Sequence, residues 1–229
     1  MVKQTNIFLD SDFEEVQITP KPVTCLGMTF ESDEARRAYF REELRKKLPE
    51  LRKIEGFPIG EDDDIINLSD PPYYTACPNP WLNDFIAEWE KEKGQLKVEG
   101  KRSDDFEVKM PYATDVSEGK NNPIYMAHAY HTKVPHPAIM RYILHYTQPG
   151  DIVFDGFCGT GMTGVAANLC GSFEDVLKLQ EKNVRVGVRH ALCSDLSPVA
   201  SLIAASYNLD YNPKQFEIKA NKIIETVEK

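Results

Sequence analysis

Two short segments of the chain carry residues whose types and spacing could do chemistry. The first, Ser69-Asp70-Pro71-Pro72-Tyr73, sets a carboxylate and an aromatic ring on either side of two prolines. The second, Asp155-Gly156-Phe157-Cys158-Gly159-Thr160-Gly161, sets small residues after a carboxylate. Each segment follows a short apolar run, so we expect each to lie at the end of a strand.

The first segment suits recognition of a planar amino group. Prolines fix φ and disfavour helical geometry at the preceding residue, which predicts an extended backbone here. The Asp70 side chain and the Pro71 carbonyl could then accept both hydrogens of an –NH₂ group, while Tyr73 stacks on the ring that bears it. A flipped adenine or cytosine presents such a group. The alternative is a proline-rich turn in which Asp70 only caps the backbone.

The second segment predicts a nucleoside cofactor. Residues 159–164 fit the pattern G-x-G-x-x-G between an apolar run and a helix. Glycines allow a sharp turn and close approach of a ligand, and the helix N-terminus offers free N–H groups. Asp195, at the end of the next predicted strand, could accept hydrogen bonds from ribose hydroxyls. The alternative is a tight glycine-rich turn without a ligand.

Two features favour S-adenosylmethionine over a dinucleotide. A dinucleotide site expects its acidic residue about 20 residues after the glycines, whereas Asp195 follows Gly161 by 34 residues. Asp155 would repel a pyrophosphate, but its charge suits the ammonium group at the amino-acid end of S-adenosylmethionine. A Rossmann-type nicotinamide-dependent enzyme is the alternative.

Taken together, the two segments resemble the DNA amino-methyltransferases, which methylate N6 of adenine or N4 of cytosine. The second segment is similar to the family's D-x-F-x-G-x-G cofactor loop, and His131-Thr132-Lys133-Val134-Pro135 is similar to its H-x-x-K-P flank. Asp195 matches the ribose-binding acid. The resemblance covers residues 65–75 and 128–205.

The chain departs from the family pattern in three places. Gly156 stands where proline is usual, the spacing between Gly161 and Asp195 is long, and only about 80 residues separate Asp70 from the cofactor loop. In family members with the catalytic segment first, several strands and a target-recognition region lie between the two. Residues 70–73 are therefore either the catalytic segment of a compressed permutation or a look-alike.

The resemblance implies transfer of a methyl group from S-adenosylmethionine to an exocyclic amine of DNA, with adenine favoured over cytosine. DNA is the expected substrate, read by regions expected outside these 229 residues, and a restriction or defence-system partner is compatible with it. The alternative is a non-catalytic module that binds cofactor or a partner protein. The resemblance implies catalytic roles for Asp70, Pro71, Pro72 and Tyr73, and cofactor-binding roles for Thr132, Lys133, Asp155, Gly156, Phe157, Cys158, Gly159, Gly161 and Asp195.

The elements that must position these residues predict an α/β fold. Strands are expected at 65–68, 151–155 and 189–194, with a further candidate at 23–26. Helices are expected from Ser32 to about 48, after Asn79-Pro80, over 137–146 and 162–169, from Pro198, and over 213–227. Residues 91–120 read as a polar linker.

These strands are too few for the seven-stranded Rossmann-like sheet that the resemblance implies. We therefore expect an incomplete sheet, in an N-terminal fragment of a larger methyltransferase. The expected parts are a helical or irregular extension (1–60), a strand, helix and acidic linker carrying Asp70–Tyr73 (61–119), and a Rossmann-like cofactor-binding part (120–229).

Composition excludes several other classes. The net charge is −9, and the excess lies in residues 61–119, with 6 basic and 15 acidic side chains, so the basic stripe of a self-sufficient nucleic-acid binder is missing. No apolar run reaches membrane-spanning length, and Met1–Asn6 leads into no signal-peptide core. Five cysteines without CxxC spacing indicate a reducing cytoplasm. The spacing of His128, His131 and His136 fits no common zinc pattern, so no metal is expected.

Overall fold

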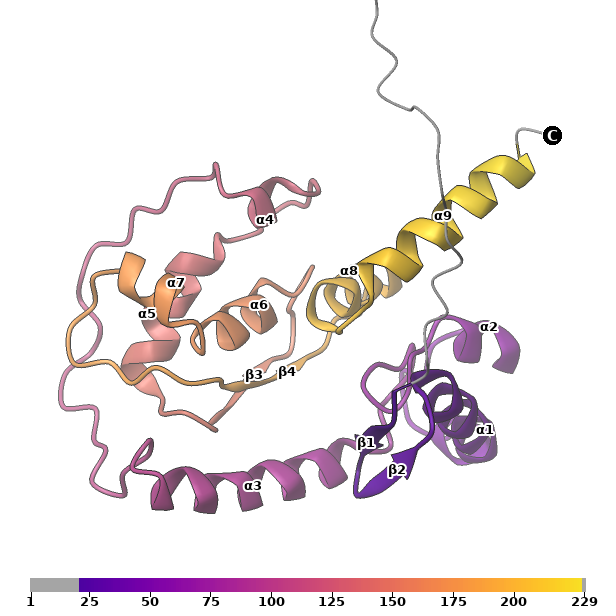
Figure 1. Ribbon diagram of the computed structural model, residues 1–229, viewed down its shortest axis with the longest axis horizontal. Helices are drawn as coiled ribbons and strands as arrows, with labels where there is room; N and C mark the ends of the chain where they lie inside the picture. The colour runs from indigo at the N-terminus through magenta and orange to yellow at the C-terminus, as the bar shows by residue number, and fades with distance from the viewer. Residues whose placement is uncertain (1–20, 228–229) are drawn as a thin grey trace, which may run out of the picture.

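The computed structural model describes residues 21–227, which form mixed α and β structure (Figure 1). β1 (Val23–Cys25) and β2 (Met28–Phe30) pair as an antiparallel hairpin, which confirms the strand candidate at 23–26. α1 (Asp33–Leu51) starts after Ser32, whose side chain accepts a hydrogen bond from the N–H of Ala35 at 3.1 Å, as predicted for a cap. Residues 1–20 lie outside the described residues, and so does the prediction that Met1–Asn6 leads into no signal-peptide core.

The strand predicted at 65–68 is wrong, because these residues form the end of a helix. α2 (Asp62–Asn67) opens with three aspartates, whose negative charge is favourable at a helix N-terminus. Glu61 is the N-cap residue of this helix. Ile65 and Ile66 are buried against α1. A short apolar run cannot be assigned to strand or helix by periodicity alone. The helix is shown by its i→i−4 hydrogen bonds, from Ile65 N–H to Glu61 O at 3.2 Å and from Leu68 N–H to Asp64 O at 3.1 Å.

The N-terminal half has a core of its own. The apolar stripe of α1 faces the hairpin, α2 and the indole of Trp81, and the ring of Phe40 lies 5.4 Å from that indole in an edge-on arrangement. The core therefore fixes the loop between α2 and α3, which carries Asp70–Tyr73. Its buried members are Cys25, Phe40, Leu44, Leu48, Ile65, Ile66 and Trp81.

α3 (Leu82–Val98) reaches from the N-terminal core toward the second half of the chain (Figure 1). Asn79 accepts a hydrogen bond from the N–H of Trp81 at 2.9 Å, just before the first turn. Trp89 stacks on His190 with the ring centroids 4.5 Å apart. The helix extends to Val98, so the linker predicted from residue 91 begins later than expected.

The polar segment after α3 lies along the second half of the chain and bonds to it. Tyr112 donates to Glu181 at 2.7 Å, and Arg141 pairs with Glu118 at 2.7 Å. These contacts explain how a segment without regular structure keeps a defined course. α4 (Pro123–Met126) follows it.

A parallel pair of strands forms the centre of the second half. β3 (Ile152–Asp155) pairs with β4 (His190–Cys193), and Asp155 lies opposite Cys193. The strands predicted at 151–155 and 189–194 are thus confirmed. Because the carboxyl ends of parallel strands meet at one edge, the segments that follow Asp155 and Cys193 lie side by side.

Buried side chains of α5 (His136–Tyr146), α6 (Met162–Leu169) and α7 (Phe173–Lys178) form a second core beside this strand pair. α8 (Pro198–Asn208) packs on α6, and α9 (Pro213–Val227) follows it without a buried residue. α5, α6, α8 and α9 agree with the predicted helices. The second core consists of Met140, Ile143, Leu144, Ala166, Ala167, Cys170, Val176 and Leu179.

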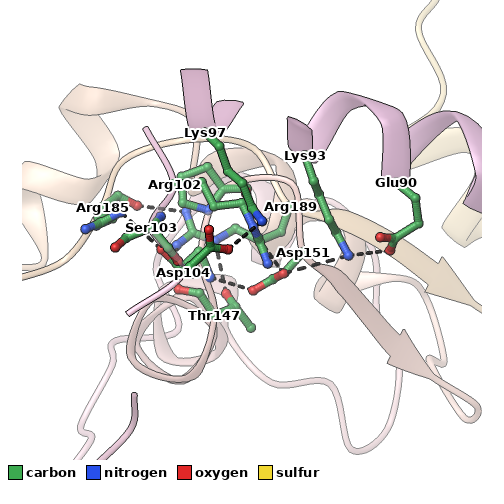
Figure 2. A network of polar contacts seen from close by, with 12 residues as sticks. Glu90, Lys93, Lys97, Arg102, Ser103, Asp104, Thr147, Asp151, Arg185 and Arg189 are labelled. Atoms are coloured by element: carbon green, nitrogen blue, oxygen red, sulfur yellow. Dashed lines mark hydrogen bonds and ion pairs between the residues drawn. The ribbon is translucent and has the colours of Figure 1, made fainter. Parts of the chain in front are cut away.

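A polar network anchors the start of β3 (Figure 2). Arg102, just beyond α3, donates to the Asp151 carboxylate at 2.6 Å, and Lys93 of α3 lies 4.0 Å from the same carboxylate. The fully buried Arg189 donates to the carbonyl oxygens of Gly187 at 2.7 Å and Thr147 at 3.0 Å. Burial lowers the pKa of Arg189. The network joins α3 to the strand that leads into the glycine-rich loop.

The described residues therefore agree with the α/β class and are compatible with a methyltransferase fold. They supply two strands of the predicted sheet rather than three, since the third is α2. No helix within residues 21–227 is both long and apolar enough to cross a membrane.

Candidate functional site: a glycine-rich cavity and an amine-acceptor turn

The loop between β3 and α6 turns on glycines in the left-handed region. Gly159 has φ of +52° and Gly161 has φ of +80°. A Cβ on Gly161 would lie 2.7 Å from the Cβ of Ala204, so glycine is also required for close packing of α6 on α8. This geometry confirms the predicted strand, loop and helix. It places the first turn of α6 beside the ends of both strands.

Asp155 is held at the start of this loop by two donors. The N–H of Phe157 donates to one carboxylate oxygen at 3.1 Å, and Thr163 Oγ1 donates to the other at 2.6 Å. An ionised carboxylate has about four acceptor sites, so it can still accept bonds from a ligand. Thr163 is therefore a positioning residue for Asp155.

Asp195 closes the loop from the side of β4. One oxygen accepts from the N–H of Gly159 at 2.9 Å and the other from the N–H of Ser197 at 2.8 Å. Ser197 in turn caps α8. The predicted ribose-binding acid is thus beside the glycine-rich loop, even though 36 residues separate Asp195 from Gly159.

A cavity of about 160 Å³ lies over the loop and is also lined by the segment before α5. The structure thereby brings together six residues predicted from sequence to bind the cofactor. Gly156, Gly161 and Asp195 belong to the same loop region but are not in the cavity lining. The lining residues include Thr132, Lys133, Asp155, Phe157, Cys158 and Gly159, together with Tyr130, Thr160, Met162 and Thr163.

The charge of Lys133 is bonded to backbone carbonyl groups near the His131–Pro135 flank and is not free for a ligand. Its ammonium group donates to the carbonyl oxygens of His128, at 2.6 Å, and Tyr125, and it lies 4.3 Å from the centroid of the Tyr125 ring. Burial lowers the pKa of Lys133. Its position supports the course of the flank past the cavity.

The residues present fit S-adenosylmethionine. Asp155 offers negative charge for the ammonium group, Asp195 offers acceptors for ribose hydroxyls, and the Phe157 ring is 83% exposed for stacking. Thr160 is a buried lining residue whose Oγ1 has no hydrogen-bond partner among the described residues. A buried polar atom of this kind needs a partner, and a polar ligand in the cavity would supply one.

The amine-acceptor turn, Asp70–Tyr74, differs from its prediction. The expected extended backbone is wrong, because Asp70 and Tyr74 exchange two backbone hydrogen bonds of 3.0 and 3.1 Å that close a tight turn. Pro71 and Pro72 are buried inside it. The Tyr73 ring lies 5.7 Å from Phe85, and burial together with a hydrogen bond to Cys25 raises the pKa of Tyr73.

Both predicted amine acceptors are bonded to an arginine of α1. Arg36 Nη1 donates to the Pro71 carbonyl oxygen at 2.7 Å, and Nη2 donates to Asp70 Oδ1 at 3.1 Å. The guanidinium carbon lies 4.9 Å from the centroid of the Tyr73 ring. Arg36 is therefore a member of this turn that the sequence analysis did not identify.

The turn and the cavity are separate but connected. Asp70, Pro71, Pro72 and Tyr73 are not in the cavity lining, so the structure does not join the two predicted halves of the site. The connection runs through Tyr74, whose hydroxyl lies 3.3 Å from the hydroxyl of Ser201 in α8. That helix starts at Pro198, three residues after Asp195.

Residues 73–174 match the model of a protein family described as DNA methylase. The matched range is less than half of the 229 residues, and it shows that this part of the chain is similar to DNA methylases. The match includes Tyr73, the flank and the cofactor loop, and it supports DNA methyltransferase activity with DNA as the substrate. Asp70, Pro71, Pro72 and Asp195 lie outside the matched range. No curated protein and no solved structure matches the chain significantly.

Several residues of the candidate site were missed from sequence. Thr163 and Thr160 stand inside the recognised glycine-rich pattern, and Tyr130 directly precedes the recognised flank, so their positions were available as signals. Within residues 21–227 no group of three or more His, Cys, Asp or Glu side chains is arranged to hold a metal ion. All five cysteines are free thiols.

Proposed function

We propose that the chain is the cofactor-binding and amine-binding part of a DNA methyltransferase that uses S-adenosylmethionine. The observation that carries this proposal is the shared cavity of the flank and the glycine-rich loop, inside the range that matches the DNA methylase family. Residues 120–229 would form the Rossmann-like cofactor part. Residues 61–119 would carry the amine-binding turn, and residues 1–60 would form the N-terminal extension.

In this proposal the cofactor-binding residues are those around the cavity. Asp155 binds the ammonium group, Asp195 the ribose hydroxyls, and Phe157 and the backbone at Gly159 contact the nucleoside. When bound, S-adenosylmethionine supplies an electrophilic methyl group. Asp155 favours S-adenosylmethionine over a nicotinamide dinucleotide, because a carboxylate repels the pyrophosphate of the dinucleotide.

The target amine would be held by the Asp70–Tyr74 turn. Asp70 and the Pro71 carbonyl accept its hydrogens, and Asp70 stabilises the positive charge that develops on the nitrogen. Adenine N6 is favoured over cytosine N4 as the acceptor. The free thiols support a reducing compartment such as the cytoplasm.

Calorimetric titration of the full chain with S-adenosylmethionine tests the cofactor assignment. Asp155→Asn and Asp195→Asn should each weaken binding about tenfold or more, since a charge-assisted hydrogen bond contributes about 1.5–3 kcal/mol. Glu174→Gln is the matched control, because Glu174 is exposed and pairs only with Lys178. Titration with NADH that succeeds where S-adenosylmethionine fails would overturn the proposal.

Transfer of a tritiated methyl group to DNA tests the catalytic assignment. Asp70→Ala should abolish transfer while leaving cofactor binding unchanged, because Asp70 does not line the cavity. Transfer that survives this substitution would remove Asp70 from the reaction.

One observation favours a second candidate, a cofactor-binding module without turnover: the amine acceptors are already bonded to Arg36. Binding of cofactor with no transfer to any DNA would support that candidate.

A further inference from the structure

Arg36 presents to the Asp70–Tyr74 turn the same set of donors that a target base would present. Its two terminal nitrogens donate to Pro71 O and Asp70 Oδ1, and its plane lies against Tyr73. A guanidinium is planar and carries N–H donors at its edge. It therefore satisfies the acceptors and the ring that we assign to an exocyclic amine and its base.

We propose that Arg36 is an internal occupant of the amine site, and that it must leave the Asp70–Tyr74 turn before a target base can bind. The inference rests on the proposed function of this turn. It adds a regulatory contact, in which helix α1 keeps the site closed in the free protein.

The acceptor atoms of the turn lie in a largely buried place beside the arginine. Arg36 is 2% exposed, Pro71 and Pro72 are fully buried, and the Asp70 side chain is 16% exposed. Although a carbonyl and a carboxylate each have more than one lone pair, a base stacked on Tyr73 would need the place over that ring, which is 45% exposed and has the Arg36 guanidinium 4.9 Å from its centroid. Binding of the base and binding of Arg36 are therefore mutually exclusive.

The contact of Arg36 with the turn is strong because it is supported from α1 itself. Asp33, at the first turn of α1, accepts from Arg36 Nε at 2.8 Å and from Arg37 Nε at 2.7 Å. Arg37 also lies 3.3 Å from the second oxygen of Asp70. Charge-assisted bonds are about twice as strong as neutral ones, so a neutral amine competes poorly with Arg36.

Equilibrium dialysis of the full chain against tritiated deoxyadenosine, deoxycytidine and thymidine tests the inference. Arg36→Met keeps the length of the side chain and removes its donors, and it should tighten binding of the two amino nucleosides about tenfold or more, because the competent state is no longer a minor one. Thymidine has no exocyclic amine and should not respond. The added substitution Asp70→Ala should abolish the gain.

Two further variants keep the test decisive if Arg36→Met does not fold. Asp33→Asn leaves the amine acceptors intact but removes the carboxylate that orients Arg36, and it should tighten deoxyadenosine binding several-fold. Arg45→Met is the matched control on the same helix, since Arg45 pairs with the exposed Asp63 and should change nothing. Circular dichroism reports whether each variant is folded.

The outcomes separate this inference from the proposed function. A folded Arg36→Met or Asp33→Asn variant that binds deoxyadenosine no better than the wild type would overturn the inference and make Arg36 a structural tie. If that happens while S-adenosylmethionine still binds, the proposed cofactor site survives. If nucleoside binding tightens but no variant transfers methyl groups to DNA, the occupied amine site stands and the catalytic proposal fails.

Discussion

Thr163 Oγ1 donates a hydrogen bond of 2.6 Å to Oδ2 of Asp155, and it links the first turn of α6 to the last residue of β3. The other oxygen of Asp155 is held by the N–H of Phe157. Together these donors fix the rotamer of the carboxylate that faces the cavity. Orientation of this charge therefore depends on a hydroxyl that does not itself need to touch the cofactor.

Thr163→Val should weaken binding of S-adenosylmethionine about tenfold, because valine keeps the shape and loses a charge-assisted hydrogen bond of about 1.5–3 kcal/mol. Calorimetric titration measures the change. Thr226→Val is the control, since Thr226 bonds only within α9. An affinity equal to that of the wild type would mean that Asp155 is oriented without Thr163.

Gly161→Ala should destabilise the fold by about 1–3 kcal/mol, the usual cost of overpacking. The new Cβ would lie 2.8 Å from the Cα of Ala204, and the backbone is in the left-handed region. Urea denaturation gives the free energy of unfolding. Gly94→Ala is the matched control, because Gly94 lies inside α3 with nothing within 4 Å of the added Cβ. This control should be stabilised by about 0.5–1 kcal/mol.

The parts of the fold that sequence predicted well are those with local signals. The end of β3, the glycines and the start of α6 follow one another within residues 152–162, and Ser197 with Pro198 marks the start of α8. The strand predicted at 65–68 failed because its apolar run is short. The signal for a helix was the acidic run Asp62–Asp64, which forms the first turn of α2 immediately before Ile65 and Ile66.

The amine-acceptor turn was harder to predict because Arg36, which bonds to its two acceptors, is distant in sequence. Arg36 and Asp70 are 34 residues apart, and no local pattern couples them. One signal was available: Arg36 precedes Phe40, Leu44 and Leu48 at intervals of four, which places it on the buried face of α1. An arginine on an apolar stripe needs buried acceptors, and Asp70 and Pro71 supply them.

Cys193 should react with iodoacetamide before Cys25 and Cys170. Cys193 is exposed, and a hydrogen bond from Cys158 lowers its pKa. Burial raises the pKa of Cys25, and it raises that of Cys170 to about 11. Since the thiolate is the reactive form, mass spectrometry of peptides after brief labelling at pH 8 should find Cys193 modified first. Cys193→Ser should remove the fast phase, and equal labelling of Cys170 would contradict the assignment.

Loss of the Asp33 ion pairs should contribute to unfolding at acid pH. Burial acts to raise the pKa of Asp33, but hydrogen bonds from Arg37 and Arg36 outweigh it and hold the pKa below its ordinary value of 3.8. The unfolded chain therefore binds this proton more readily than the folded chain. The resulting stability is present above about pH 4 and disappears as pH falls through the lower pKa of the folded state.

Asp33→Asn should thus be less stable than the wild type at pH 7, by about 1 kcal/mol or less because Asp33 is 46% exposed and solvent screens its ion pairs. Below the pKa of the folded state the two proteins should become equally stable with respect to this group. Urea denaturation from pH 7 down to pH 2 measures the convergence. Glu50→Gln is the control on the same helix, since Glu50 pairs only with the exposed Lys53. If the difference in stability between wild type and Asp33→Asn stays constant down to pH 2, Asp33 is not ionised against Arg36 and Arg37. In that case Arg36 holds α1 on the Asp70–Tyr74 turn without a contribution from Asp33.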